Sequence, residues 1–218
     1  MSIILSPLPP IATPRFDRLL AELPQEQATI FQEVRAHLAP LLESAPYLME
    51  LAHTHSAWLA EAISGDADTA FGVLLTAVSD AGQTDDEAKV ASILRIAKGR
   101  TALLAAVAET GGHWTTARAT EALSDLADAA LEAALDFLVR QAAMKGQLKV
   151  PLEQARAANS GLALFALGKH GGRELNYSSD IDIVAFFDPQ RSPLVDPNEA
   201  TKIFSRMVQK LVGLMEDR

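Results

Sequence analysis

The sequence predicts an α+β fold, in which a mostly helical region of residues 1–150 is followed by an α/β region of residues 151–218. Three observations carry this prediction. Apolar residues recur at three- or four-residue intervals through most of the first region, which is the period of one helix face. Two short apolar segments, residues 161–167 and 180–187, have the length and composition of strands. A further helical pattern follows them.

The first helices are predicted from apolar spacing and from prolines. Pro24 precedes a helix predicted over residues 25–39, in which apolar side chains recur at helical spacing. Pro40 and Pro46 are expected to interrupt the chain after it, because proline disrupts a helix interior. Residues 47–63 are predicted to form one or two short helices.

The middle of the chain carries clear start and stop signals. A helix is predicted over residues 66–81 from its apolar face. Thr84, followed three residues later by Glu87, matches a capping box and predicts the start of the next helix. Gly111 and Gly112 are expected to end that helix.

A long alanine-rich helix is predicted next. Thr115 or Thr116 is expected to cap it, and the apolar pattern continues to about Met144. Residues 146–158 are then expected to form a junction before the first predicted strand. After the second strand, the sequence Asp-Pro-Asn-Glu at 196–199 combines a cap with a proline at the first helical position, and predicts a final helix.

The composition excludes several classes of protein. Apolar residues make up 49% of the 218 residues and charged residues 22%, a balance that favours a packed core over disorder. The formal net charge is −9 and no run of lysines and arginines is present, so nucleic acid is not an expected partner. Cysteine is absent, which excludes disulfides and thiolate metal sites and is compatible with a cytoplasmic location.

Membrane and secretory classes are not expected either. No segment of the sequence is apolar for long enough to span a bilayer. Residues 1–13 lack the basic start and the long apolar core of a signal peptide. We therefore expect a cytoplasmic protein that has no membrane partner.

The most informative motif lies between the two predicted strands. The first strand leads into residues 169–179, a stretch rich in glycine, asparagine and serine that contains the pair Gly171 and Gly172. Glycines leave backbone N–H groups uncovered, and such groups can hold phosphate oxygens. A Gly-Gly pair alone is most often a simple turn. Its place directly after a strand favours a phosphate-binding role here.

Asp180 and Asp182 complete the motif. On a strand, side chains two residues apart share a face, so these carboxylates are expected to point together while Ile181 and Ile183 point into the core. Two like charges so close are costly unless a cation lies between them. Mg²⁺ is usually held by one or two carboxylates together with substrate phosphates, so the pattern indicates a metal-dependent nucleotidyl transfer site.

Other polar residues of the motif have two open interpretations. Lys169 and Arg173 flank the glycines, and either neutralise phosphate charge or are solvated loop residues. Ser178 and Ser179 either donate hydrogen bonds to a phosphate or cap the turn.

The stretch from Leu167 to Asp182, LGKHGGRELNYSSDID, also resembles the signature of glutamine synthetase adenylyltransferases. These bifunctional enzymes attach AMP to a tyrosine of glutamine synthetase and remove it again. The resemblance extends upstream into helical segments and covers most of the chain from about Pro46 onward. His170 stands where an aliphatic residue is more frequent in the family.

The resemblance implies a polymerase-β-like nucleotidyltransferase palm, of which residues 151–218 would be the beginning. It implies catalysis and binding of Mg²⁺ or Mn²⁺ by Asp180 and Asp182, with ATP or ADP as the nucleotide. It further implies glutamine synthetase as a partner, with a PII-type regulatory protein as a second one. The phosphate- or nucleotide-binding residues would be Gly171, Gly172, Ser178, Ser179 and Lys169.

The family carries two nucleotidyltransferase units in tandem, and a motif that follows a helical lead-in resembles the first, which is credited with phosphorolytic removal of AMP. The family's palm also has a third carboxylate on a later strand, which is not visible in this sequence. We therefore expect an N-terminal fragment of a longer enzyme, inactive by itself. Two alternatives stay open: a protein-binding module with an incomplete nucleotide site, and a nucleotidyltransferase that acts on a different acceptor.

Overall fold

The computed structural model describes residues 12–190 and 192–216, and within this range the protein is a mostly helical α+β structure, as predicted. The chain divides into two compact units between Gly65 and Asp66. The long helices give way to strands near residue 150, where the sequence predicts a domain boundary. That this point separates two domains stays a prediction. The part of the predicted helical region that falls in residues 1–11 lies outside the described residues, as do Asp217 and Arg218 after the last helix.

The first unit is built from short helices. They are α1 (Pro14–Glu22), α2 (Gln25–Glu33), α3 (Arg35–Ser44), α4 (Pro46–Thr54) and α5 (Ser56–Ser64). Pro14 and Pro46 lie in the first turn of α1 and α4, where the missing N–H would have had no helical partner. The prediction of one or two short helices over residues 47–63 is confirmed, because α4 and α5 cover it.

Two predictions for this unit are wrong. The helix predicted over residues 25–39 is divided at Val34, whose φ of −99° and ψ of 12° leave the helical region. Pro40 lies inside α3 and does not end it. A proline there removes one backbone hydrogen bond, and the burial of Leu38 and Leu42 on the same helix outweighs that loss.

The second unit is dominated by longer helices. They are α6 (Ala67–Ala81), α7 (Glu87–Thr110), α8 (Thr116–Met144) and α10 (Ala200–Glu216), with short 3₁₀ turns at Leu152–Gln154, Ala157–Asn159 and Pro197–Glu199. Helix α8 packs against α6, α7 and α10, and most of its apolar residues are buried. The guanidinium of Arg118 on α8 pairs with Asp68 of α6 at 2.8 Å and lies 4.7 Å from the ring centre of Trp114.

Local capping explains where these helices begin. The side chain of Asp66 accepts a hydrogen bond from the Thr69 N–H at the start of α6, and Thr115 accepts one from Arg118 N–H at the start of α8. The predicted capping box at Thr84 is wrong by two residues. Asp86 caps α7 by accepting from two backbone N–H groups, because its carboxylate is a better acceptor for the first turn.

The predicted strands form a two-stranded antiparallel ribbon. Strand β1 (Leu162–Ala166) pairs with β2 (Ile183–Phe187), and the short helix α9 (Gly168–Gly171) follows β1 directly. One face of the ribbon packs on α10, where the rings of Phe187 and Phe204 are 4.9 Å apart. An apolar run such as that of β1 often lies buried on both faces, but β1 does not, because Phe165 on the opposite face is 55% exposed and its ring centre lies 5.7 Å from that of the exposed Phe186.

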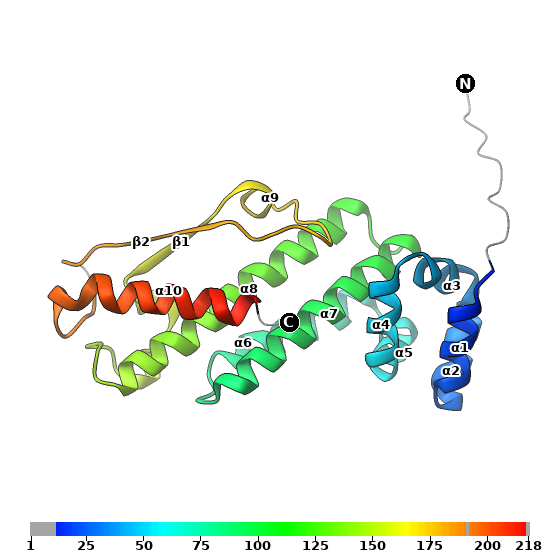
Figure 1. Ribbon diagram of the computed structural model, residues 1–218, viewed down its shortest axis with the longest axis horizontal. Coiled ribbons are helices and arrows are strands. Elements are labelled where there is room, and N and C mark those ends of the chain that lie inside the picture. Colours follow the sequence, from blue (N-terminus) through cyan, green and yellow to red (C-terminus); the bar gives the residue numbers. More distant parts are fainter. Residues whose placement is uncertain (1–11, 191, 217–218) are drawn as a thin grey trace, which may run out of the picture. The chain divides into compact units, whose positions relative to one another are not determined.

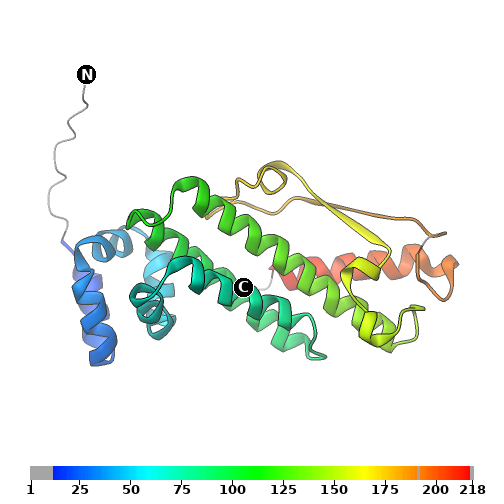
Figure 2. The ribbon, with the colours of Figure 1, turned by 180° about the vertical axis from the view of Figure 1, so that it is seen from behind.

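Helix α8 connects these parts of the second unit. Figures 1 and 2 show it running through the unit, with α7 beside it and the ribbon lying along the α8 and α10 layer. The segment between the two strands therefore extends along α8, which places the sequence motif against this helix.

Candidate functional site

Asp180 and Asp182 come directly before β2, which begins three residues later than predicted. The antiparallel pairing nevertheless continues one step beyond the strand ends, because the Leu167 N–H donates to the Asp182 carbonyl oxygen at 2.8 Å. Both aspartates are exposed, whereas Ile181 and Ile183 between and after them are half-buried. This alternation is that of an extended chain, in which the two carboxylates share a face.

The two carboxylates are free of protein partners within the described part of the chain. In residues 12–190 and 192–216 neither side chain makes a hydrogen bond or an ion pair. No group of three His, Asp or Glu side chains in these ranges could hold a metal ion by itself. Two oxygen donors without a third suit Mg²⁺, which commonly completes its coordination shell with phosphate oxygens and water. The residues present therefore fit the implied cation.

Gly168 allows the first turn of α9 to lie beside Asp182. Its φ is +55°, a left-handed conformation that glycine adopts without a steric penalty. A Cβ at this position would lie 3.4 Å from the Asp182 Oδ2 atom. The Asp182 carboxylate thus lies close to the backbone at the start of α9.

Gly171 is required for a different reason, since its backbone is pressed against the end of β1. A Cβ at this position would lie 2.6 Å from the Ala166 carbonyl oxygen, a distance that no side chain can occupy without moving the backbone. Gly172 has more room, because its nearest atoms would be the Gly168 oxygen at 3.5 Å and the Glu174 carboxyl group at 3.8 Å. The two glycines of the pair therefore have different structural roles.

The backbone N–H groups of Gly171 and Gly172 are not uncovered in this conformation. They donate to the Leu167 and Gly168 carbonyl oxygens, each at 3.0 Å. The glycines therefore provide a tight approach of α9 to β1, and their contact with phosphate stays a prediction. The Lys169 side chain is exposed at the same turn and has no ion pair within the described ranges.

Ser178 and Ser179 take part in a turn around Asn176. The Asn176 Oδ1 atom accepts from the Ser178 N–H at 3.1 Å and from the Ser179 hydroxyl at 2.8 Å. The Asn176 N–H donates in return to the Ser179 hydroxyl oxygen at 3.0 Å. The turn-capping interpretation explains these contacts, and a role in nucleotide binding stays a prediction.

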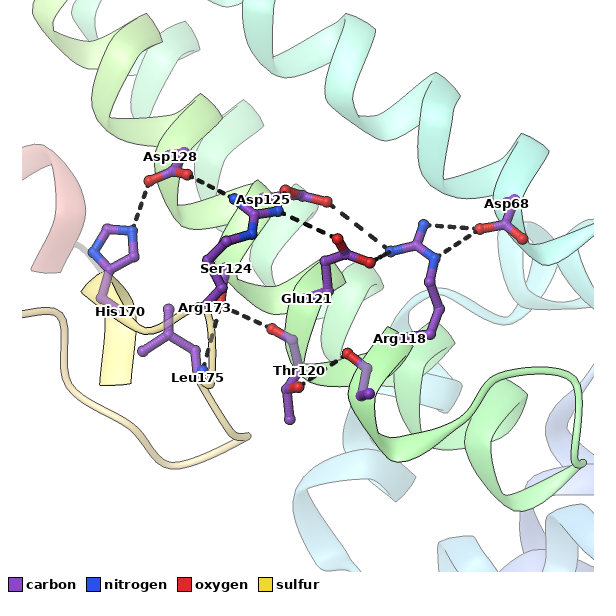
Figure 3. Close-up of polar contacts among 11 residues, drawn as sticks. Asp68, Arg118, Thr120, Glu121, Ser124, Asp125, Asp128, His170, Arg173 and Leu175 are labelled. Carbon is purple, nitrogen blue, oxygen red and sulfur yellow. Dashed lines mark hydrogen bonds and ion pairs between the residues drawn. The ribbon is translucent and has the colours of Figure 1, made fainter. Parts of the chain in front are cut away.

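Residues 168–179, which we call the α9 loop, are docked on α8 through His170. Its side chain is almost fully buried, and its Nε2 atom lies 2.8 Å from the Asp128 Oδ1 atom (Figure 3). The Nδ1 atom is buried without a hydrogen-bond partner in the described residues. The imidazole therefore fills the space between loop and helix, and contributes one charged or polar contact.

Arg173 adds a second contact with the same helix. Its guanidinium forms an ion pair with Asp125 and lies 3.6 Å from Asp128 and 3.7 Å from Glu121 (Figure 3). The hydrogen bond and the charge of Asp125 raise the pKa of Arg173 above its ordinary value. The φ of Arg173 is +58°, which is unusual for a residue with a side chain. The ion pairs hold the loop in this conformation.

Two further contacts extend the docked segment. Leu175 is buried, and its N–H donates to the Ser124 hydroxyl oxygen at 3.3 Å, while that hydroxyl donates to the Thr120 carbonyl oxygen at 2.8 Å. The Tyr177 hydroxyl donates to the Glu109 carboxylate at 3.2 Å. Partial burial of the ring and the Glu109 charge raise the pKa of Tyr177.

Sequence reasoning did not assign a role to this docking surface. Glu121, Asp125 and Asp128 are spaced to lie on one face of α8, a signal that is visible in the sequence. Their partners His170 and Arg173 lie more than 40 residues further along, so only the fold reveals the pairing.

No helix in the described part of the chain is long and apolar enough to cross a membrane.

Residues 35–218 match the family model of glutamate-ammonia ligase adenylyltransferase. Relatives named bifunctional glutamine synthetase adenylyltransferase/adenylyl-removing enzyme include those of Xanthobacter autotrophicus, 39% identical over 84% of this chain, and Bradyrhizobium diazoefficiens, 36% identical over 94% of it. The enzyme of that name from Bradyrhizobium sp. strain ORS 278 is 36% identical over 96% of the chain. The matches cover 19%, 21% and 22% of these relatives, so the chain spans about a fifth of their length.

Proposed function

The chain belongs to the glutamate-ammonia ligase adenylyltransferase family, and from this premise we propose that it is part of an enzyme that regulates glutamine synthetase by transfer and removal of AMP. The proposal extends the names of the relatives to this chain, which covers only part of their length. Glutamine synthetase is the proposed partner, with a PII-type protein as a regulator. The proposed location is the cytoplasm.

We assign the nucleotide chemistry to the region of Asp180 and Asp182. The observation that supports it is the pair of exposed carboxylates on one face, without a protein partner in the described residues, beside the Gly168 turn. These aspartates would hold Mg²⁺ or Mn²⁺, and a bound cation would neutralise charge on the nucleotide phosphates. Lys169 would add a positive charge at the same turn, and the glycines would allow the phosphates to approach the backbone.

We propose that the nucleotidyltransferase region that contains Asp180 and Asp182 removes AMP by phosphorolysis. A phosphate oxygen would attack the adenylyl phosphorus in line with the tyrosyl oxygen, the new P–O bond would form ADP, and the tyrosyl oxygen would leave and take up a proton. The contribution of the protein in such a displacement is mainly positioning and charge neutralisation. The assignment to the removing half is supported by the helical lead-in before the motif, which resembles the first of the family's two units.

Calorimetric titration of the chain with ADP, with and without Mg²⁺, tests the binding part of this proposal. We expect saturable binding that requires the cation and is lost in Asp180→Asn. In a full-length relative that carries the equivalent aspartates, Asp182→Ala is expected to abolish the AMP-removing activity while the protein stays folded. Retained turnover in that variant would remove Asp182 from the mechanism.

A second candidate function is a protein-binding module that is inactive by itself. The exposed Phe165 and Phe186 rings on the outer face of the ribbon favour a contact with further protein. Absence of metal-dependent ADP binding in a folded wild-type chain would support this function over the first. The two functions are compatible if another segment of the enzyme supplies a third carboxylate. A fragment without that carboxylate would bind the nucleotide but would not catalyse the reaction.

A further inference from the structure

A cavity of about 320 Å³ lies between α8 and α10, well separated from the α9 loop. Its apolar floor is formed by Leu138 and Ala142 of α8 and Met207 of α10, which are all buried. Leu138 is ten residues beyond Asp128, or about 15 Å along the helix axis. A ligand in this cavity would therefore not contact the docked part of the α9 loop.

Basic side chains surround this apolar floor. Lys145 comes from the end of α8, and Lys202, Arg206 and Lys210 come from successive turns of α10, while Glu199 is the one acidic residue of the lining. The whole chain has a formal charge of −9, so a cavity with four basic residues and one acid differs sharply from the average surface. Cations of this kind, gathered around a concave site, attract anions.

The charges of these basic residues are incompletely neutralised. Lys202 pairs with Glu199, and Lys210 lies 3.3 Å from Glu87. The two lysines and their two acidic partners are each about half exposed, so both ion pairs are weak. Lys145 and Arg206 have no acidic partner within residues 12–190 and 192–216. Two cations from two different helices are thus available at the rim of the cavity.

We propose that this cavity binds a small organic anion that carries at least two negative charges and an apolar group. The charged end would contact Lys145 and Arg206, because a guanidinium can form two parallel hydrogen bonds to a phosphate or carboxylate. The apolar end would cover the floor of Leu138, Ala142 and Met207. Since α8 also carries the docking surface of the α9 loop, the ligand would bind to the same helix at a different place. This site is independent of the proposed AMP chemistry.

The test is an NMR titration of backbone amides in the whole chain at low salt, with phenyl phosphate as the probe. Inorganic phosphate serves as the probe with charge alone, and phenol as the probe with the ring alone. We expect saturable shifts at Lys145, Gln147 and Arg206, with phenyl phosphate binding at least about tenfold more tightly than either part. Signals around Asp180 and Asp182 are expected to stay in place.

The double variant Lys145→Glu/Arg206→Glu is expected to weaken binding at least about tenfold. The matched control is Lys89→Glu/Lys98→Glu on α7, which changes the net charge equally at two exposed lysines outside the cavity. Equal weakening in both variants, or shifts that do not saturate, would overturn the proposal. If the charge-reversed protein does not fold, Lys145→Gln/Arg206→Gln replaces it with the same expected direction, and unchanged affinity in that variant would also overturn it.

Discussion

The part of the α9 loop that contacts α8 and the segment that ends in Asp180 and Asp182 use their polar groups in opposite ways. In the first, His170 and Arg173 have carboxylate partners and the Leu175 N–H has a hydroxyl partner. In the second, neither aspartate has a hydrogen bond or an ion pair within the described ranges. The docked part therefore fixes the conformation of the loop, and the second segment has its charges available for a ligand.

The difference has an energetic consequence. Removing a docked group takes away a contact that the folded state has and the unfolded state lacks, so stability is expected to fall. Removing a free carboxylate relieves repulsion and takes away no contact, so stability is expected to change by less than about 0.5 kcal/mol. Substitutions in the two segments should thus separate into effects on folding and effects on binding.

The largest effect on folding is expected for Gly171→Ala. The new Cβ would lie 2.6 Å from the Ala166 carbonyl oxygen, which is backbone and cannot move freely. We expect a loss of roughly 1–3 kcal/mol in the free energy of unfolding, measured by denaturant titration. Gly172→Ala is the matched control, because its nearest atoms are at 3.5 Å or more, and it should cost less than half as much. Equal losses in both variants would show that the tight packing of α9 on β1 is not the cause.

His170→Ala is expected to have the next largest effect. It removes a buried ring and its 2.8 Å contact with Asp128, which is itself partly exposed, so we expect a loss of about 1–2 kcal/mol. Hydrogen exchange at the Arg173 and Glu174 amides should become faster, since both close the turn that follows α9. Asp128→Asn keeps an acceptor for His170 and should cost less. Unchanged exchange in His170→Ala would contradict docking through this ring.

A smaller effect on stability is expected at Arg173, where two substitutions distinguish the contribution of the backbone conformation from that of the side-chain ion pairs. Both Arg173→Ala and Arg173→Gly remove the ion pairs with α8, but only glycine tolerates the φ of +58° without strain. We expect Arg173→Ala to lower the free energy of unfolding, and Arg173→Gly to lower it less, because glycine relieves the strain of the left-handed conformation. Thermal unfolding of the three chains in parallel measures the difference. A glycine variant less stable than the alanine variant would show that the left-handed conformation is not retained in solution.

The smallest effect concerns pH and Tyr177. Burial and the Glu109 charge raise the pKa of Tyr177 above its ordinary value of 10.0, so the folded state favours the neutral phenol. Its contribution to stability is fully present below pH 10.0 and is lost as the pH rises above that value. Tyr177→Phe should therefore lose less stability than the wild type between about pH 9 and pH 11, as measured by denaturant titration. Parallel pH curves for the two chains would contradict this account.

Local sequence signals were sufficient for much of the fold. The cap at Thr115, the stop at Gly111 and both strands depend on neighbouring residues, and each was predicted from the sequence. Pro40 was mispredicted because packing of its helix outweighs the local preference.

The contacts between distant segments could not be predicted in the same way. The shared face of Asp180 and Asp182 follows from their spacing, whereas the pairing of His170 with Asp128 depends on how α8 packs against the α9 loop. The basic cavity was invisible for a similar reason. Lys145 and Arg206 are far apart in the sequence, so no run of basic residues indicates it.

The most direct test of the central claim is the broadening of backbone amide NMR signals by Mn²⁺ in the presence of ADP. We predict that the broadening is centred on Gly168 and on Asp180 to Ile183, and that it disappears in Asp180→Asn/Asp182→Asn while the rest of the spectrum shows a folded chain. Broadening centred on Glu121, Asp125 and Asp128 of α8, or broadening that persists in the double variant, would contradict the assignment of the metal to the two free aspartates.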